Sequence, residues 1–128
     1  MSHTQQTVQS HTKQLIQGTH SASTEYDVFS GGGASTIITI QSLIIVNNDA
    51  NSSHTVTLTK QEYDGGYSAV LTQTYTVASN ASEVPFEFYG VSLEGSATNP
   101  DKIVVEFGTA LVDAGDTIDI QATSVKFE

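Results

Sequence analysis

The chain has 128 residues, a formal net charge of −10, four lysines, no arginine and no cysteine. This length suits one domain, and the lack of cysteine excludes a disulfide framework, a thiolate nucleophile and a cysteine metal site. With so few basic residues, the chain cannot neutralise a row of phosphates, so we expect no nucleic-acid partner and no anionic membrane partner.

An extended arm is predicted at the N-terminus. Residues 1–24 are rich in Gln, Ser, Thr and His, and their apolar side chains include Val8, Leu15 and Ile16 in a pattern that fits no helical face. Because chain ends of this composition seldom pack, we expect an arm or a frayed strand here. The three apolar residues are candidates for contact with a partner.

A glycine triplet is interpreted as a flexible joint after this arm. Gly31–Gly33 breaks any regular element. We therefore divide the chain into an N-terminal arm with its joint, residues 1–33, and a folded domain, residues 34–128.

The remaining chain alternates between apolar and polar residues, and Thr55–Thr59 is the clearest example. This period of two is typical of half-buried β-strands. Turn-forming clusters separate the strands, at 47–53, 64–66, 79–82, 95–100 and 114–116. The pattern predicts an all-β fold, an antiparallel β-sandwich of seven or eight strands, and leaves jelly-roll and immunoglobulin-like topologies both open.

Three local details of the strands are also predicted. The strand that contains Ile38 and Ile40, continuing to Val46, should pair with Thr55–Thr59 as an antiparallel hairpin. The apolar phase flips near Gly90, which predicts a bulge or bend there. A second phase change at Thr123–Ser124 is expected to turn the next apolar side chains inward.

No catalytic constellation stands out, so the chain is predicted not to be an enzyme and to need no cofactor. Glu87 and Glu106 are expected on the polar faces of strands, where exposed glutamates are common. His54 follows a turn and is expected to face solvent, and no Gly-x-Ser-x-Gly motif accompanies it.

Three aspartates, spaced three residues apart, could form a calcium-binding site. Asp113, Asp116 and Asp119 surround a tight turn, and calcium prefers closely spaced oxygen ligands. Asp-Gly and Gly-Asp pairs are also ordinary turn residues, and the EF-hand pattern is absent. No metal site is predicted, although calcium at these three residues stays open.

Two tyrosines are further candidates for contact with a partner. Tyr63 and Tyr67 flank the turn 64–66 and would stand at the tip of a hairpin. Cross-strand packing explains them equally well.

Two stretches of the sequence resemble a family. Ile38–Leu58 is an apolar strand, then Val-Asn-Asn-Asp, a small polar turn and Thr-Val-Thr-Leu, and Ala114–Ala122 is a Gly-Asp turn that leads into the final strand. This layout looks like the small β-sandwich structural proteins of tailed-bacteriophage virions, which decorate or cement the head or sit in the tail.

The resemblance implies a capsid decoration or cement protein that binds the major capsid protein, or another virion protein, and copies of itself. It implies a location in the virion, after assembly in the host cytoplasm, and self-association that is threefold by analogy. The arm would add a strand to the open sheet edge of a neighbour. The alternative is a carbohydrate-binding or adhesive module of a tail or cell surface.

Overall fold

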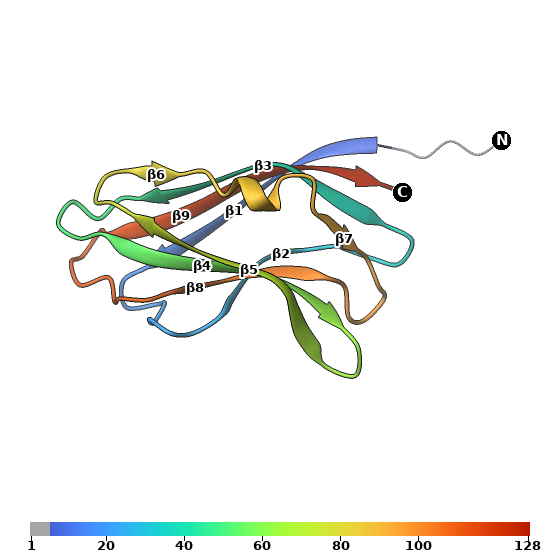
Figure 1. Ribbon diagram of the computed structural model, residues 1–128, viewed down its shortest axis with the longest axis horizontal. Helices are drawn as coiled ribbons and strands as arrows, with labels where there is room; N and C mark the ends of the chain where they lie inside the picture. Colours follow the sequence, from blue (N-terminus) through green and yellow to red (C-terminus); the bar gives the residue numbers. More distant parts are fainter. Residues whose placement is uncertain (1–5) are drawn as a thin grey trace.

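Nine strands make up two stacked antiparallel sheets in the computed structural model, which describes residues 6–128 (Figure 1). A single 3₁₀ turn, η1 (Phe86–Phe88), is the one helical element of that part of the chain. None of its helices is long and apolar enough to cross a membrane. The strands are β1 (Gln6–Ile16), β2 (Tyr26–Ser30), β3 (Ile37–Asn47), β4 (His54–Tyr63), β5 (Tyr67–Val77), β6 (Ser82–Glu83), β7 (Ser92–Glu94), β8 (Lys102–Phe107) and β9 (Thr117–Phe127).

The strand order confirms the predicted antiparallel sandwich, although the described residues form nine strands where seven or eight were expected. One sheet runs β1-β9-β3-β6, with β7 also paired to β3, and the other runs β2-β8-β4-β5. Every strand pair is antiparallel. β1 and β2 lie beside each other at one side of the sandwich, and β5 and β6 lie beside each other at the opposite side.

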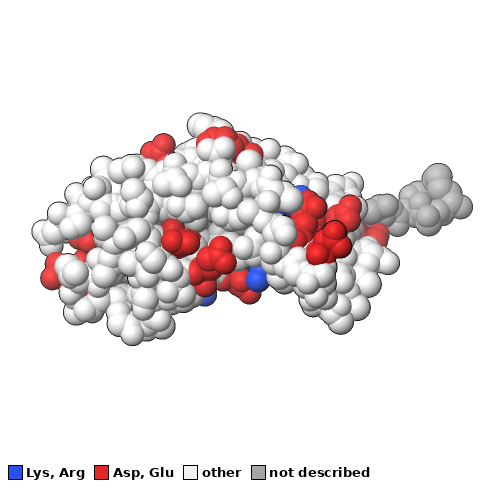
Figure 2. All heavy atoms as spheres, turned by 60° about the horizontal axis from the view of Figure 1, so that its bottom comes forward, with Lys and Arg blue, Asp and Glu red and all other residues white. Residues whose placement is uncertain are grey.

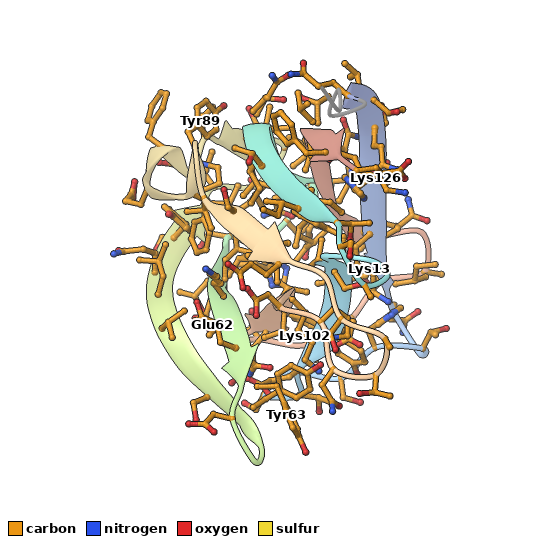
Figure 3. All side chains as sticks on the ribbon, turned by 90° about the vertical axis from the view of Figure 1, so that its right-hand side faces the viewer. Lys13, Glu62, Tyr63, Tyr89, Lys102 and Lys126 are labelled. Carbon is orange, nitrogen blue, oxygen red and sulfur yellow. The ribbon has the colours of Figure 1, made fainter. Side chains whose placement is uncertain are left out.

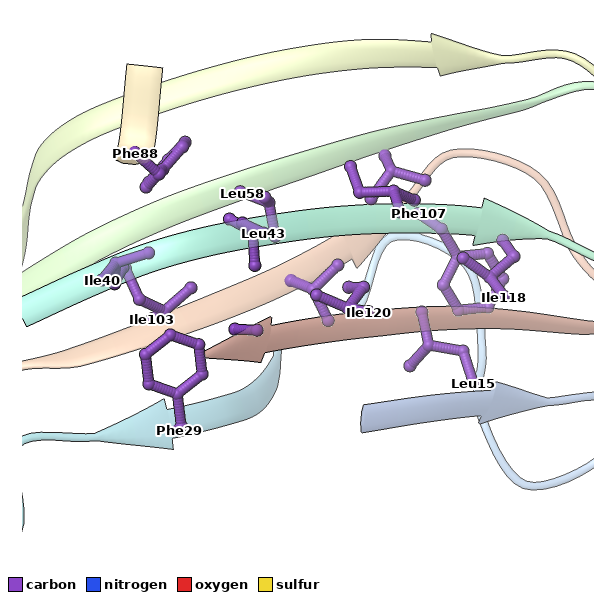
Figure 4. Packing of buried hydrophobic residues seen from close by; sticks show 14 of the residues in the cluster. Leu15, Phe29, Ile40, Leu43, Leu58, Phe88, Ile103, Phe107, Ile118 and Ile120 are labelled. Carbon is purple, nitrogen blue, oxygen red and sulfur yellow. The ribbon is translucent and has the colours of Figure 1, made fainter. Parts of the chain in front are cut away.

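The core fills the space between the two sheets (Figure 4). Each central strand sends alternate side chains inward, since successive residues of a strand point to opposite faces. The fully buried apolar side chains come from both sheets and from η1, and the largest are Phe88, Phe107, Leu15, Ile40, Leu43, Ile45, Leu58, Leu93, Ile103, Ile118 and Ile120.

A bulge in β3 changes which of its side chains reach the core. The pairing with β9 shifts between Ile40 and Ser42, so one extra residue lies in β3 at that point. Ile38 and Ile40 are buried before the bulge, and Leu43 and Ile45 are buried after it. The bulge thus keeps an apolar face inward along a strand whose sequence alone suggests two apolar faces.

The predicted hairpin between β3 and β4 is wrong. β3 belongs to the β1-β9-β3-β6 sheet, whereas β4 belongs to the other sheet, so residues 48–53 carry the chain across the sandwich. The loop is long enough to cross, and both strands bury an apolar face, so placing them in opposite sheets covers both faces at once. Among residues 6–128, β4–β5 is the one hairpin whose strands are consecutive and pair along their length.

The extended N-terminal arm is not confirmed. Within the described residues, β1 pairs with β9 along all of its 11 residues, from Gln6 opposite Phe127 to Ile16 opposite Thr117. Leu15 is fully buried in the core. The sequence is misleading because the half-buried positions of β1 before Leu15 are polar, namely Gln9, His11 and Lys13, so no apolar alternation marks the strand.

The glycine triplet packs tightly at Gly31, where a flexible joint was expected. A side chain at Gly31 would place its Cβ 2.5 Å from the carbonyl oxygen of Glu94, closer than real Cβ atoms come. The Gly31 N–H donates to the carbonyl of Asp101, and Thr36 Oγ1 donates to the carbonyl of Gly31. Glycine is needed here because two backbone segments approach each other.

Two phase changes were predicted near the C-terminal half, and one of them is found. Gly90 has a φ of 82°, which only glycine adopts readily, and the chain bends there as expected. No slip occurs at Thr123–Ser124, since alternate residues of β9 stay inward through Ala122 and Ser124. Ser124 can be buried because its hydroxyl is hydrogen-bonded to His11 Nε2 at 2.8 Å.

Neighbouring substitutions in β1 test its place in the sandwich. Leu15→Ala should lower the free energy of unfolding by about 2 to 5 kcal/mol, because it empties a fully buried site. Ile16→Ala is the matched control and should cost well under half as much, since Ile16 is 38% exposed. Urea denaturation measures both free energies of unfolding. Equal and small losses for the two variants would mean that β1 is not packed into the sandwich.

Candidate functional site

Two long strands lie at opposite edges of the sandwich, one in each sheet. Within residues 6–128, β1 pairs only with β9 and β5 pairs only with β4. Each strand has 11 residues, so each sheet presents a long row of backbone N–H and C=O groups on one side. Such an edge is a template for pairing with another chain.

Exposed apolar side chains accompany both edges. Val8 on β1 is 70% exposed and Val70 on β5 is 52% exposed. Ile16, at the end of β1, is partly exposed. Of the predicted contact residues in this region, Val8 and Ile16 therefore lie at the surface, whereas Leu15 packs inside its own chain and is not available to a partner. Val70 was missed because the sequence gives no sign that β5 is an edge strand.

Tyr63 ends β4 and Tyr67 begins β5, so both stand at the tip of this hairpin as predicted. Figure 3 shows Tyr63 there. The two tyrosine rings pack edge to face with centroids 5.2 Å apart. The Tyr67 hydroxyl donates to the carbonyl of Pro100 at 2.9 Å, and Lys102 Nζ lies 4.2 Å from the centre of the Tyr67 ring. Because a lysine already covers this ring, Tyr67 is poorly placed to stack on a sugar.

Acidic side chains outnumber lysines on the face that Figure 2 shows, in keeping with 14 acidic and four basic residues in the sequence. Three of the four lysines are already paired with carboxylates, in Lys60–Glu62, Lys102–Asp27 and Lys126–Glu128. The fourth, Lys13, lies 5.8 Å from the centre of the Tyr26 ring. The part of the chain that the structure describes therefore has no cluster of unpaired lysines.

The predicted acidic candidates do not converge. Asp113 accepts from Asn51 Nδ2, whereas Asp119 accepts from Gln14 Nε2 and Asn48 Nδ2. Asp116 is buried, and its Oδ2 has no hydrogen-bond partner among the described residues. Over residues 6–128, no group of three or more histidines and carboxylates is arranged to hold a metal ion.

Glu87 and Glu106 also lie on different elements. Glu87 is in η1, because Pro85 ends the expected strand, and its Oε1 accepts from the Tyr75 hydroxyl at 3.0 Å. Burial raises the pKa of Tyr75, and the hydrogen bond to Glu87 raises it further. Glu106 lies on β8 opposite Thr57 of β4. This arrangement offers no pair of carboxylates around a cleft.

His11 and His20 pack against aromatic rings, although the sequence suggests that they are solvated. His11 stacks on Phe29 with ring centroids 4.4 Å apart, and burial lowers its pKa. The His20 ring packs against Tyr26, and its Nδ1 accepts from the backbone N–H of Ile16. His3 lies outside the described residues.

The prediction that His54 faces solvent is wrong, since only 1% of its surface is accessible. Its Nε2 lies 2.8 Å from Asp49 Oδ2, and its Nδ1 lies 2.7 Å from Thr109 Oγ1. Asp49 Oδ1 also accepts from the backbone N–H groups of Asn51 and Ser52. Sequence reasoning missed this cluster because Thr109 is 55 positions from His54 along the chain.

The side chain of Asn47 holds the crossing loop in place beneath this cluster. Its Nδ2 donates to the carbonyls of Ser52, Val77 and Ala78, and its Oδ1 accepts from the N–H of Asp49. Asn47 is fully buried, so these bonds satisfy polar groups that would otherwise be costly to bury.

Comparison with known proteins relates the chain by fold alone. No family model matches it, and no curated protein matches it. Among solved structures, it is similar to a protein of Bacillus endospore appendages, which form a family of disulfide-linked pili. The TM-score is 0.51 at 16% identity, over 98% of this chain and 90% of that one. At this identity, the similarity extends to the β-rich fold and no further.

The Asp49–His54 pair predicts a loss of stability in acid. The hydrogen bond from His54 lowers the pKa of Asp49, and those from the Asn51 and Ser52 N–H groups act in the same direction. A lowered pKa means that this carboxylate stabilises the fold above the unfolded pKa of about 4, and that its contribution is lost as the pH falls below that value.

Denaturation by urea between pH 3 and pH 7 measures this effect. The free energy of unfolding of the wild type should fall more steeply below about pH 4 than that of Asp49→Asn. Asp64→Asn, at the exposed hairpin turn, is the matched control and should follow the wild type. Parallel curves for the wild type and Asp49→Asn would mean that the carboxylate is not stabilised by folding.

Proposed function

We propose that this chain is a structural subunit that assembles with copies of itself through its sheet edges. The observation that carries the proposal is the pair of long edge strands, β1 and β5, each with an exposed valine. A solitary protein usually protects such edges with lysine, proline or a covering loop. Within the described part of β1 and β5, the one lysine is Lys13 and there is no proline.

The fold similarity supports the same role. The similar structure belongs to appendages described as disulfide-linked pili, which are assemblies of protein subunits. The present chain contains no cysteine, so its copies have no disulfide to link them. We propose that backbone hydrogen bonds between edges and contacts of the exposed valines hold its copies together.

Charge sets the condition for this assembly. Each copy carries a formal charge of −10, so copies repel one another at low ionic strength. Salt screens this repulsion, since the Debye length falls from about 30 Å at 0.01 M to about 8 Å at 0.15 M. Association should therefore strengthen as salt is raised over this range.

A capsid decoration or cement protein of a tailed bacteriophage is the finer form of the proposal. It rests on the resemblance of Ile38–Leu58 and Ala114–Ala122 to small virion sandwich proteins. In that setting the partner would be the major capsid protein, and the edges would join neighbouring copies on the particle surface. The molecule would act by binding, with no turnover of a substrate.

Edge substitutions test self-assembly. Val8→Glu and Val70→Glu each place a charge beside an edge strand, so each should abolish higher-order species or weaken association by about 10-fold or more. Val112→Glu is the matched control, because Val112 is 65% exposed but lies in the loop after β8. Sedimentation velocity and electron microscopy at 0.15 M salt measure the outcome. A wild type that stays monomeric at millimolar concentration would overturn the proposal.

Binding to phage capsids tests the proposal that the chain is a capsid decoration protein. Purified wild-type protein should co-sediment with phage capsids that lack decoration, at a fixed number of copies per capsid, and Val112→Glu should behave alike. Normal self-assembly without any capsid binding would leave the structural role standing and remove the capsid as its place.

A further inference from the structure

Two loops at one end of the sandwich bring together an aspartate, a histidine and a hydroxyl. Asp49 lies in the loop that crosses from β3 to β4, His54 is the first residue of β4, and Thr109 lies in the loop between β8 and β9. The chain of contacts runs from Asp49 Oδ2 to His54 Nε2, at 2.8 Å, and from His54 Nδ1 to Thr109 Oγ1, at 2.7 Å. Asn51 Nδ2 also donates to Asp113 Oδ2, which ties the two loops together.

The contacts of Asp49 decide which nitrogen of His54 carries the proton. Hydrogen bonds from His54, Asn51 and Ser52 keep the pKa of Asp49 low, so its carboxyl group is ionised near neutral pH and only accepts hydrogen bonds. His54 Nε2 must therefore donate to Asp49. In the neutral imidazole, Nδ1 is then the acceptor and points at the Thr109 hydroxyl, which donates to it.

This is the arrangement that activates a hydroxyl nucleophile. A base within hydrogen-bond reach takes the proton of the hydroxyl as it attacks, and a third group orients the base. Here the base and the orienting group are both buried, whereas Thr109 is exposed to solvent.

A surface hollow lies beside the hydroxyl. It is lined by His54 and Thr109 together with loop residues, namely Asn51, Ser52, Ser53, Ala110 and Val112. The hydroxyl groups of Ser52 and Ser53 are hydrogen-bond donors that suit a carbonyl oxygen, and Val112 offers an apolar wall. A small ester is the class of molecule that fits both features.

We propose that Thr109 is an activated nucleophile that accepts an acyl group from an ester, with His54 as its general base and Asp49 as a positioning residue. Thr109 Oγ1 forms a bond to the ester carbonyl carbon, and its proton moves to His54 Nδ1. The tetrahedral intermediate then collapses, the bond to the leaving alkoxide breaks, and the alkoxide takes the proton from His54. The product is a chain acylated once, at Thr109.

Acylation of this hydroxyl is independent of the proposed assembly. Thr109 lies in the loop between β8 and β9 and not on the open edge of β1 or β5, so loss of its hydroxyl should leave assembly intact. The site differs from every candidate that the sequence suggested, since no motif surrounds Thr109.

The test is acetylation of the full chain by p-nitrophenyl acetate at neutral pH. Release of p-nitrophenol gives the rate, intact mass gives the number of acetyl groups, and peptide mass mapping gives their positions. Thr109 should be acetylated about 100-fold faster than the other hydroxyls, which is within the range that general base catalysis provides. Thr109→Ser should keep the fast reaction, and Thr109→Val should lose it.

Matched variants separate chemistry from folding. Thr74→Val removes an exposed hydroxyl that is hydrogen-bonded to Thr57 on the sheet, so it should react as the wild type does. Asp49→Asn should slow acetylation in a chain whose circular dichroism spectrum shows that it is folded. Equal hydroxyl acetylation in the wild type and Thr109→Val, or acetyl groups spread over many hydroxyls, would overturn the proposal. Sedimentation of Thr109→Val tests assembly separately.

Discussion

The burial of two apolar sheet faces against each other is the constraint on which the whole molecule depends. Each sheet has four or five strands, and neither face could remain in water without a large free-energy cost. The chain meets this constraint by passing repeatedly from one sheet to the other, so most consecutive strands are not paired neighbours. The polar bonds of Asn47 and Asp49 make one such crossing possible, because they satisfy the loop groups that the crossing buries.

The same constraint limits which surfaces can bind other molecules. Inner faces are filled by side chains, so the structure leaves edges, outer faces and loops for contact with other molecules. The edges β1 and β5 are long and carry exposed valines, which favours association with further copies. In the assembly that we propose, the strong negative charge opposes association, and ionic strength would therefore control it.

The cluster at Asp49, His54 and Thr109 follows from the crossing rather than from any local motif. A tight loop needs its N–H groups satisfied, and the carboxylate of Asp49 accepts two of them. The remaining oxygen then fixes the orientation of His54, whose other nitrogen reaches the opposite loop. Loop packing and the proposed activation of the Thr109 hydroxyl thus rest on one set of hydrogen bonds.

Several parts of this protein were determined by its sequence alone. Period-two alternation and turn residues predicted an antiparallel sandwich, the bend at Gly90 and the hairpin tip with Tyr63 and Tyr67, because these depend on neighbours along the chain. Tertiary structure alone decided that β1 is a strand, that β3 and β4 lie in opposite sheets, and that Thr109 meets His54. These features depend on contacts between residues far apart in the chain, and the hydrogen bonds and burial that select them exist only once the two sheets have closed.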